Sequence, residues 1–199
     1  MLGVGPHGVF VDANVLYSRT LRDWLGLLYT LPEYPLFQVY WSEDVLAETL
    51  YNLRRSHPEW PGVRLSSVRD RIAATFEVGR VADFPIDETW QGRDSNDGHV
   101  HSAALACRAD VLLTANVLDF ESESAPYTVY APDDFFVLVD DSAPEHVRAA
   151  VLQEVAYWLS RGQEPHLPQN LRKAGCPVFA ERVRTHLLAI ETLPPLFNG

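Results

Sequence analysis

Short apolar runs that end in polar or acidic residues recur along the first two thirds of the chain. Four of them are too short for a typical helix and rich in β-branched or aromatic side chains: 8–12 (GVFVD), 36–41 (LFQVYW), 110–115 (DVLLTA) and 127–131 (YTVYA). Continuous apolar runs of this kind are typical of strands buried on both faces of a parallel sheet. The pattern therefore predicts a mostly parallel sheet.

Apolar residues at helical spacing lie between and after these runs. Asn14 is expected to cap a helix that Leu31 and Pro32 end, and Ser42 is expected to cap the next one. The expected helices cover 15–30, 43–55, 65–77, 96–108, 132–136, 144–160 and 177–190, with 78–95 irregular or weakly extended. Strands that alternate with helices imply crossover connections and an α/β fold.

The strand pattern stops after about residue 142, and only helical periodicity follows. We therefore expect one α/β domain over 1–141 and a helical C-terminal extension over 142–199.

Composition narrows the class of protein. No apolar run approaches the roughly 18 residues that cross a bilayer, so no membrane partner is expected. The N-terminus has no signal-peptide pattern. The spacing of Cys107 and Cys176 fits no metal or redox motif, and two free thiols in the cytoplasm are expected. A net charge of −11 argues against a general nucleic-acid coat but not against a nuclease that holds metal with carboxylates.

Three acids stand where predicted elements begin or end. Asp12 closes the first strand, where ligands of open parallel sheets bind, although an Asp there is more often a turn residue. Asp97 falls in line with the inward side of its predicted helix and would cost desolvation energy unless a cation meets it; stabilisation of the helix dipole is the plainer alternative. Glu48 lies beside the apolar stripe of its helix, where it could reach a cleft or face solvent.

The run 110–115 delivers Thr114 and Asn116 to a strand end, and Asp119 follows closely. If this strand neighbours the first, these residues converge on Asp12. Carboxylates that converge repel one another and are suited to holding a hard divalent cation. No zinc spacing, phosphate-binding glycine loop or hydrolase elbow is present.

Two histidines flank Asp97. His101 is one turn away and could hydrogen-bond that acid, whereas His99 is expected to point elsewhere, and structural or supporting roles are expected for both. The arginines that could hold phosphates, with surface ion pairs as the default alternative, are Arg19, Arg22 and Arg93.

Four segments, in this order, resemble the PIN-domain family: VFVDANVLYSRTLRD, WSEDVLAETLYNL, DSNDGHVHSAALACRADVLLTANVLDF and YAPDDFF. They are most similar to the VapC-like branch, the toxins of toxin–antitoxin pairs. The resemblance spans about 8–140, and the third segment is its most specific part. The helical tail resembles the C-terminal extension of one VapC-like subgroup.

The resemblance implies a three-layer α/β/α fold with a central, mostly parallel sheet and RNA cleavage that depends on Mg²⁺, with Mn²⁺ as a substitute. By position, Asp12, Glu48 and Asp97 are the metal-binding acids of the family, and Asn116 completes the catalytic set. The expected supporting or substrate-positioning residues are Asn14, Thr114, Asp119 and Arg22.

Two residues depart from the family pattern. Asn96 stands where this branch often has an Asp, and Asn116 occupies a fourth acidic position. Both departures remove a negative charge, which puts a second metal site in doubt.

The resemblance also implies an RNA substrate and a separate antitoxin protein, and it leaves a homodimer open. Two alternatives remain. A non-catalytic PIN domain would bind RNA or protein without metal turnover. An aspartyl-phosphate phosphatase would also place Asp after the first strand, but it needs a second Asp two residues on, where this chain has Asn14.

Overall fold

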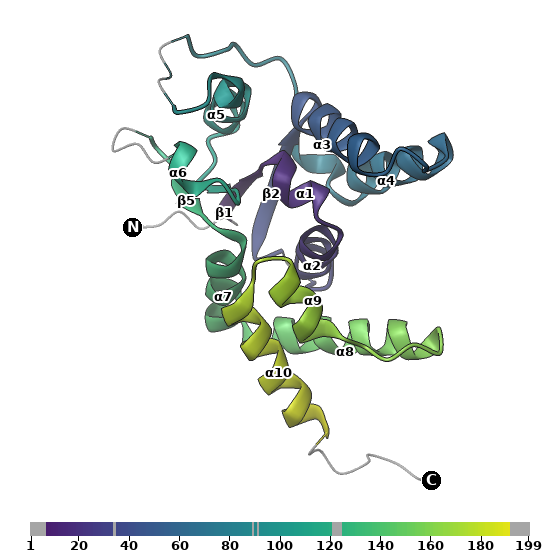
Figure 1. Cartoon of the computed structure of the whole chain (residues 1–199). Coiled ribbons are helices and arrows are strands. Elements are labelled where there is room, and N and C mark those ends of the chain that lie inside the picture. The colour runs from purple at the N-terminus through teal and green to yellow at the C-terminus, as the bar shows by residue number, and fades with distance from the viewer. Residues whose placement is uncertain (1–6, 34, 89, 91, 121–124, 192–199) are drawn as a thin grey trace. The chain divides into compact units, whose positions relative to one another are not determined.

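A five-stranded parallel sheet forms the centre of the N-terminal part of the chain in the computed structural model (Figure 1). The structure describes residues 7–33, 35–88, 90, 92–120 and 125–191. The strands are β1 (His7–Val11), β2 (Phe37–Ser42), β3 (Arg80–Val81), β4 (Val111–Leu113) and β5 (Thr128–Tyr130). Their order across the sheet is β3-β2-β1-β4-β5.

The strand order determines where the helices lie. From β1 the chain moves outward to β2 and β3, and then returns to add β4 and β5 on the other side of β1. Because crossovers between parallel strands are right-handed, the two directions put their helices on opposite faces of the sheet. Figure 1 shows α3 and α4 on one side and α5 and α6 on the other. The domain is thus a three-layer α/β/α fold, as the family resemblance implies.

The helices of this part are α1 (Ala13–Tyr17), α2 (Arg19–Thr30), α3 (Glu43–Ser56), α4 (Gly62–Thr75), α5 (Gly98–Ala106) and α6 (Val117–Phe120), with single 3₁₀ turns η1 (Glu77–Gly79) and η2 (Ser95–Asp97).

The central strand is buried on both faces. Val9 of β1 is in register with Val39 of β2 on one side and with Val111 of β4 on the other. Val9, Phe10 and Val11 are all fully buried. This burial explains the continuous apolar run from which the strand was predicted.

The predicted helix over 15–30 is wrong in one respect, because it is two helices. Asp12, not Asn14, caps α1, and its carboxylate accepts a hydrogen bond from the Ala13 amide. Ser18 then caps α2 through the Leu21 amide. Two capping residues six positions apart allow the chain to stop and restart a helix here. The cap of α3 at Ser42 is confirmed.

Three short elements were not predicted. They are β3, α6 and, in the C-terminal part, α9 (Leu167–Lys173). Two, four and seven residues are too few for a periodicity to be recognised, and tertiary contacts decide their conformation.

The chain divides into two compact units, one up to Pro132 and one from Asp133 onward. The second unit contains most of α7 (Pro132–Ser142), with α8 (Pro144–Ser160), α9 and α10 (Pro177–Glu191). The sequence analysis placed the boundary after 141 and so assigned α7 to the α/β domain. The contacts of α7 explain the difference: Phe136 packs on Phe179 of α10 with ring centroids 5.1 Å apart, and buried Asp140 lies 2.6 Å from His186 Nε2.

Asp133 ties the start of α7 to the start of α10. Its carboxylate accepts hydrogen bonds from the amides of Val178, at 3.0 Å, and Phe179, at 2.8 Å. These amides belong to the first turn of α10, which has no helical carbonyl to bind.

We therefore expect Asp133→Ala to lower the free energy of unfolding by about 1–2 kcal/mol, the usual loss when a capping side chain is removed. Chemical denaturation measures the change. Asp134→Ala is the matched control, because it removes an exposed acid from the same first turn of α7. Equal losses in the two variants would contradict the capping role.

Within the described ranges, no helix is both long and apolar enough to cross a membrane. Cys107 and Cys176 are both free, as predicted. Burial raises the pKa of Cys107 to about 11 and that of Cys176 to about 12, so neither is a reactive thiolate.

Candidate functional site

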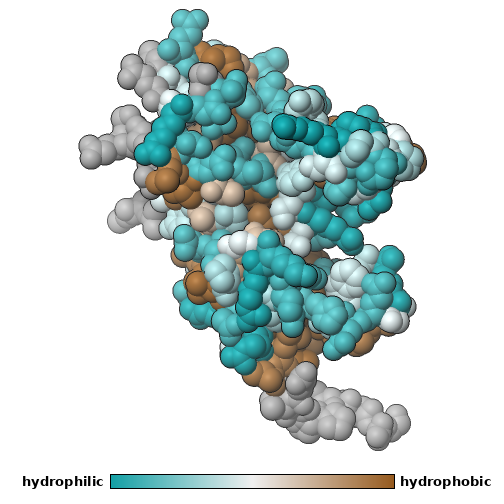
Figure 2. Space-filling view, in the orientation of Figure 1, coloured by the Kyte–Doolittle hydropathy of each residue, from teal (hydrophilic) through white to brown (hydrophobic). Residues whose placement is uncertain are grey.

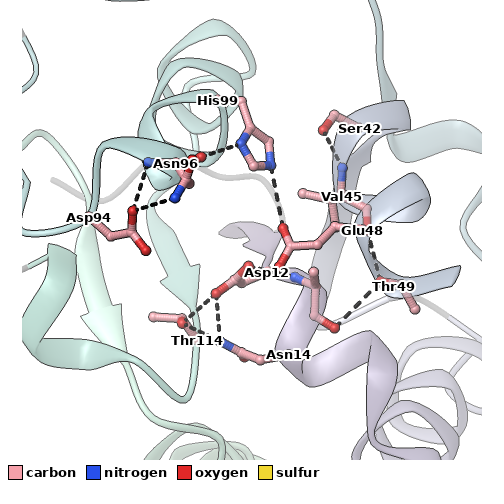
Figure 3. A network of polar contacts seen from close by, with 11 residues as sticks. Asp12, Asn14, Ser42, Val45, Glu48, Thr49, Asp94, Asn96, His99 and Thr114 are labelled. Atoms are coloured by element: carbon pink, nitrogen blue, oxygen red, sulfur yellow. Dashed lines mark hydrogen bonds and ion pairs between the residues drawn. The ribbon is translucent and has the colours of Figure 1, made fainter. Parts of the chain in front are cut away.

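Asp12 is the buried centre of a polar network at the carboxyl end of β1 (Figure 3). One carboxylate oxygen accepts from the Ala13 amide at 2.6 Å. The other accepts from the Asn14 side-chain amide at 2.6 Å and from the Thr114 hydroxyl at 2.7 Å. Burial raises the pKa of Asp12, although these hydrogen bonds oppose the shift.

Asn14 and Thr114 join the ends of β1 and β4. The Asn14 amide also donates to Thr114 Oγ1 at 3.0 Å, and its oxygen accepts from the Ala115 backbone at 3.0 Å. The two strands are neighbours, so their carboxyl ends meet, as the sequence analysis required. Both residues hold the Asp12 carboxylate in one orientation.

Glu48 extends from α3 toward Asp12. Figure 3 shows its carboxylate beside that of Asp12, and the charge of Asp12 contributes to raising the pKa of Glu48, after burial. Of the two positions that the sequence left open, the structure therefore shows the one that reaches Asp12. Its side chain is 43% exposed, so solvent still reaches it.

Asp97 stands at the last residue of η2, directly before α5. Burial and four neighbouring acids raise its pKa from 3.8 to about 6. Those acids, in order of effect, are Asp12, Asp94, Asp119 and Glu48. The predicted convergence of Asp12, Glu48 and Asp97 is thus visible in their mutual electrostatic interaction.

Asp94 is a member of this group that the sequence analysis missed. It acts on both Asp97 and Glu48, and it accepts hydrogen bonds from the amide and the side chain of Asn96, each at 2.9 Å. Its spacing of three residues from Asp97 was the available signal. The signal was weak because 78–95 showed no periodicity from which to infer a direction.

The two histidines have the opposite arrangement from the one predicted. His99 faces the acids: its Nε2 lies 3.8 Å from Glu48 Oε2, and its charge acts on Asp12. The α-helix begins at Gly98 and follows a 3₁₀ turn, so counting 100° per residue from position 96 gives the wrong phase.

His101 points to the other side of α5, and the hydrogen bond to Asp97 that the sequence suggested is replaced by other partners. Its Nδ1 lies 2.6 Å from the Tyr127 hydroxyl and its Nε2 lies 3.4 Å from Asp87. Trp90 stacks on its ring, with centroids 5.8 Å apart. Burial lowers the pKa of His101, against the opposing effect of Asp87. These contacts hold the segment before Asp94 against α5.

Asn116 is exposed at the carboxyl end of β4, and its backbone amide donates to Thr114 Oγ1 at 3.0 Å. Its carbonyl accepts from the Asp119 amide at 3.0 Å, which starts α6. Asp119 is half-buried, and its charge reaches Asp97.

Arg22 is not brought to the acids. It is buried in α2, and its Nη1 donates to the carbonyl of Leu16, near the break between α1 and α2. Burial lowers its pKa. The expected role in holding phosphate is therefore replaced by a local structural one, because the predicted single helix is broken at Ser18.

The acids interact through charge without being in ligating contact. In the part of the chain that the structure describes, no three His, Cys, Asp or Glu side chains are close enough together to hold a metal ion. A cation among these carboxylates would offset their repulsion and lower their pKa values. Carboxylate and amide oxygens are the donors that Mg²⁺ and Mn²⁺ accept, so the side-chain chemistry fits a divalent ion.

Comparison with known proteins gives the class of the fold. A family model described as PIN domain matches residues 8–118, more than half of the chain. The protein belongs to the PIN-domain family, whose members are generally nucleases and typically use divalent metals.

Among solved structures, a chain from "Structure of FitAB bound to IR36 DNA fragment" is similar to this one at 17% identity and a TM-score of 0.39. The similarity covers 62% of this chain and 94% of that chain. A search among curated proteins returned no match.

Proposed function

We propose that this protein is a metal-dependent endoribonuclease that hydrolyses RNA phosphodiester bonds, and that it is the toxin of a type II toxin–antitoxin pair. The observation that carries the enzymatic part is Asp97, whose pKa is raised to about 6 by burial and by four further acids around it. Carboxylates that repel one another are suited to holding a divalent cation, because the ion offsets their charge.

Asp12 and Asp97 are the residues that would hold the ion. Asp12 is held in one orientation by Asn14 and Thr114, so little ordering energy is lost when a ligand binds. The bound Mg²⁺ or Mn²⁺ would orient the phosphate and lower the pKa of a water molecule.

Glu48 is positioned to accept the proton of that water. Its raised pKa makes it a stronger base than an ordinary carboxylate, and its partial exposure leaves a path for substrate. The water oxygen forms a bond to phosphorus while the bond to the 3′ oxygen breaks, and the departing oxygen takes a proton from solvent. The products carry a 5′ phosphate and a 3′ hydroxyl.

The antitoxin partner and the cytoplasmic location rest on the resemblance of the sequence to the VapC-like branch. The C-terminal unit offers apolar surface for such a protein or for a second copy of this chain. Figure 2 shows an apolar area over α10. The exposed apolar residues of α10 include Val178, 53% exposed, and Leu188, 48% exposed.

The alternatives have less support. An aspartyl-phosphate phosphatase needs a second Asp two residues after the nucleophile, where this chain has Asn14. A non-catalytic PIN domain has no need for five interacting acids, which cost stability when they are charged.

The direct test is cleavage of a defined RNA by the purified protein with Mg²⁺, with Mn²⁺ and with EDTA, beside Asp12→Asn. We expect metal-dependent fragments with 5′ phosphates, and none from the variant. Divalent-metal binding without cleavage would favour the non-catalytic alternative, and a trapped phosphoaspartate at Asp12 would favour the phosphatase.

Asn116 gives a second prediction about the metal. Its amide oxygen brings no negative charge, so we expect at most one ion to bind without RNA, near Asp12 and Asp97, and the second to need phosphate oxygens. Asn116→Asp should tighten Mn²⁺ binding about tenfold, because it adds a carboxylate to an exposed position at the same strand end.

Titration calorimetry without RNA measures this change. Asn170→Asp, in α9 of the other unit, is the matched control for the added charge. Two ions per wild-type chain in the absence of RNA would show that another acid, such as Asp119, already replaces the missing charge.

A further inference from the structure

The ring of His99 has a defined tautomer. Its Nδ1 lies 2.8 Å from the backbone carbonyl oxygen of Asn96. A carbonyl can only accept a hydrogen bond, so Nδ1 carries the hydrogen. In the neutral ring the lone pair is therefore on Nε2.

That second nitrogen is directed at the acids. Nε2 is fully buried and, within the described residues, has no hydrogen-bond partner. Glu48 Oε2 is 3.8 Å away, which is too far for a hydrogen bond.

The surroundings of His99 match those of a metal-binding histidine. Figure 3 shows the His99 ring directed toward the carboxylate of Glu48, which lies beside that of Asp12. Histidines that bind metal commonly donate their other ring N–H to a backbone carbonyl, which orients the ring. The Asn96 carbonyl occupies that role here.

We propose that, when the divalent ion of this nuclease binds, His99 Nε2 becomes a nitrogen ligand to it, and that this ligand makes the site prefer Mn²⁺ to Mg²⁺. The inference rests on the proposed metal-dependent function. Mg²⁺ takes oxygen ligands almost exclusively, whereas first-row transition ions bind imidazole more strongly. One imidazole among carboxylates therefore shifts the selectivity toward Mn²⁺ without excluding Mg²⁺.

Pulsed electron paramagnetic resonance of the full-length protein with bound Mn²⁺ tests the ligand directly. We expect the ¹⁴N modulation of one coordinated imidazole in the wild type and its loss in His99→Phe and His99→Gln. His57→Gln removes a partly exposed histidine from the loop before α4 and should leave the signal unchanged. Bound Mn²⁺ without nitrogen coupling in the wild type would overturn the assignment of His99 and leave the proposed nuclease intact.

Calorimetric titrations with each metal test the selectivity. In His99→Gln an amide oxygen can replace the nitrogen, so we expect Mn²⁺ binding to weaken roughly tenfold while Mg²⁺ binding changes little. Equal weakening for both ions would contradict a nitrogen-based preference. If the wild type binds neither ion, the proposed metal-dependent function fails together with this inference.

Discussion

Asp97→Asn is expected to reduce RNA cleavage by roughly a thousandfold or more while making the metal-free protein more stable. The loss of activity follows from removing one of the two carboxylates proposed to hold the metal, and losses of this size are common for a single electrostatic group at an active site. The gain in stability follows from removing a charge that burial and four neighbouring acids disfavour.

The pH dependence of this stability has a definite sign. The pKa of Asp97 is raised from 3.8 to about 6, so the folded state binds the proton more tightly than the unfolded state does. The associated stability is fully present below pH 3.8 and is lost as the pH rises through about 6. Above about pH 6 we expect Asp97→Asn to be more stable than the wild type by about 1–2 kcal/mol, after allowance for solvent screening at this half-buried position.

Thermal unfolding of the wild type and of Asp97→Asn, at pH 4 and pH 8 without divalent ions, measures this difference in stability. Asp44→Asn is the matched control, because it removes an exposed acid from the first turn of α3. That change should slightly lower the stability at pH 8, since the helix dipole favours the acid. A wild-type cleavage rate in Asp97→Asn would end the assignment of Asp97 as a metal ligand.

Mg²⁺ or Mn²⁺ should raise the melting temperature of the wild type. An ion that binds only the folded state stabilises it by about 2.7 kcal/mol at 100 times the dissociation constant. The effect should disappear in Asp12→Asn. It should also weaken below about pH 6, because protons compete with the metal at Asp97.

Differential scanning fluorimetry over a metal series at pH 5.5 and pH 7.5 is sufficient for this measurement. Ca²⁺ serves as a size control, because it prefers longer bonds and more ligands than Mg²⁺. An unchanged melting temperature at millimolar Mg²⁺ and Mn²⁺, with calorimetry also flat, would favour a binding module without metal turnover.

Much of the α/β domain was predictable from the sequence, because its information is local. A strand buried on both faces must be apolar throughout, and β1 and β4 are recognisable for that reason. In β2, where Gln38 and Tyr40 are only half-buried, the aromatic and β-branched residues give the signal. Asp12 and Thr114 follow directly from where two of these strands end. The parallel pairing of β1 with β4 then brings both residues together.

The boundary of the second unit was less predictable. The apolar pattern of α7 resembles that of any amphipathic helix and does not show which unit it packs against. Only the cap of Asp133 on α10 and the packing of Phe136 on Phe179 make α7 part of the C-terminal unit.

The sequence by itself determined the parallel sheet, the family and the three acids that meet at its edge. The tertiary structure decided which further side chains join them. His99 rather than His101 faces the acids, because a 3₁₀ turn shifts the phase of α5 and His101 contacts Tyr127 and Asp87 instead. Asp94 is a further acid whose charge acts on this group. A helical wheel assumes one continuous geometry, so it cannot register a change of helix type that distant contacts stabilise.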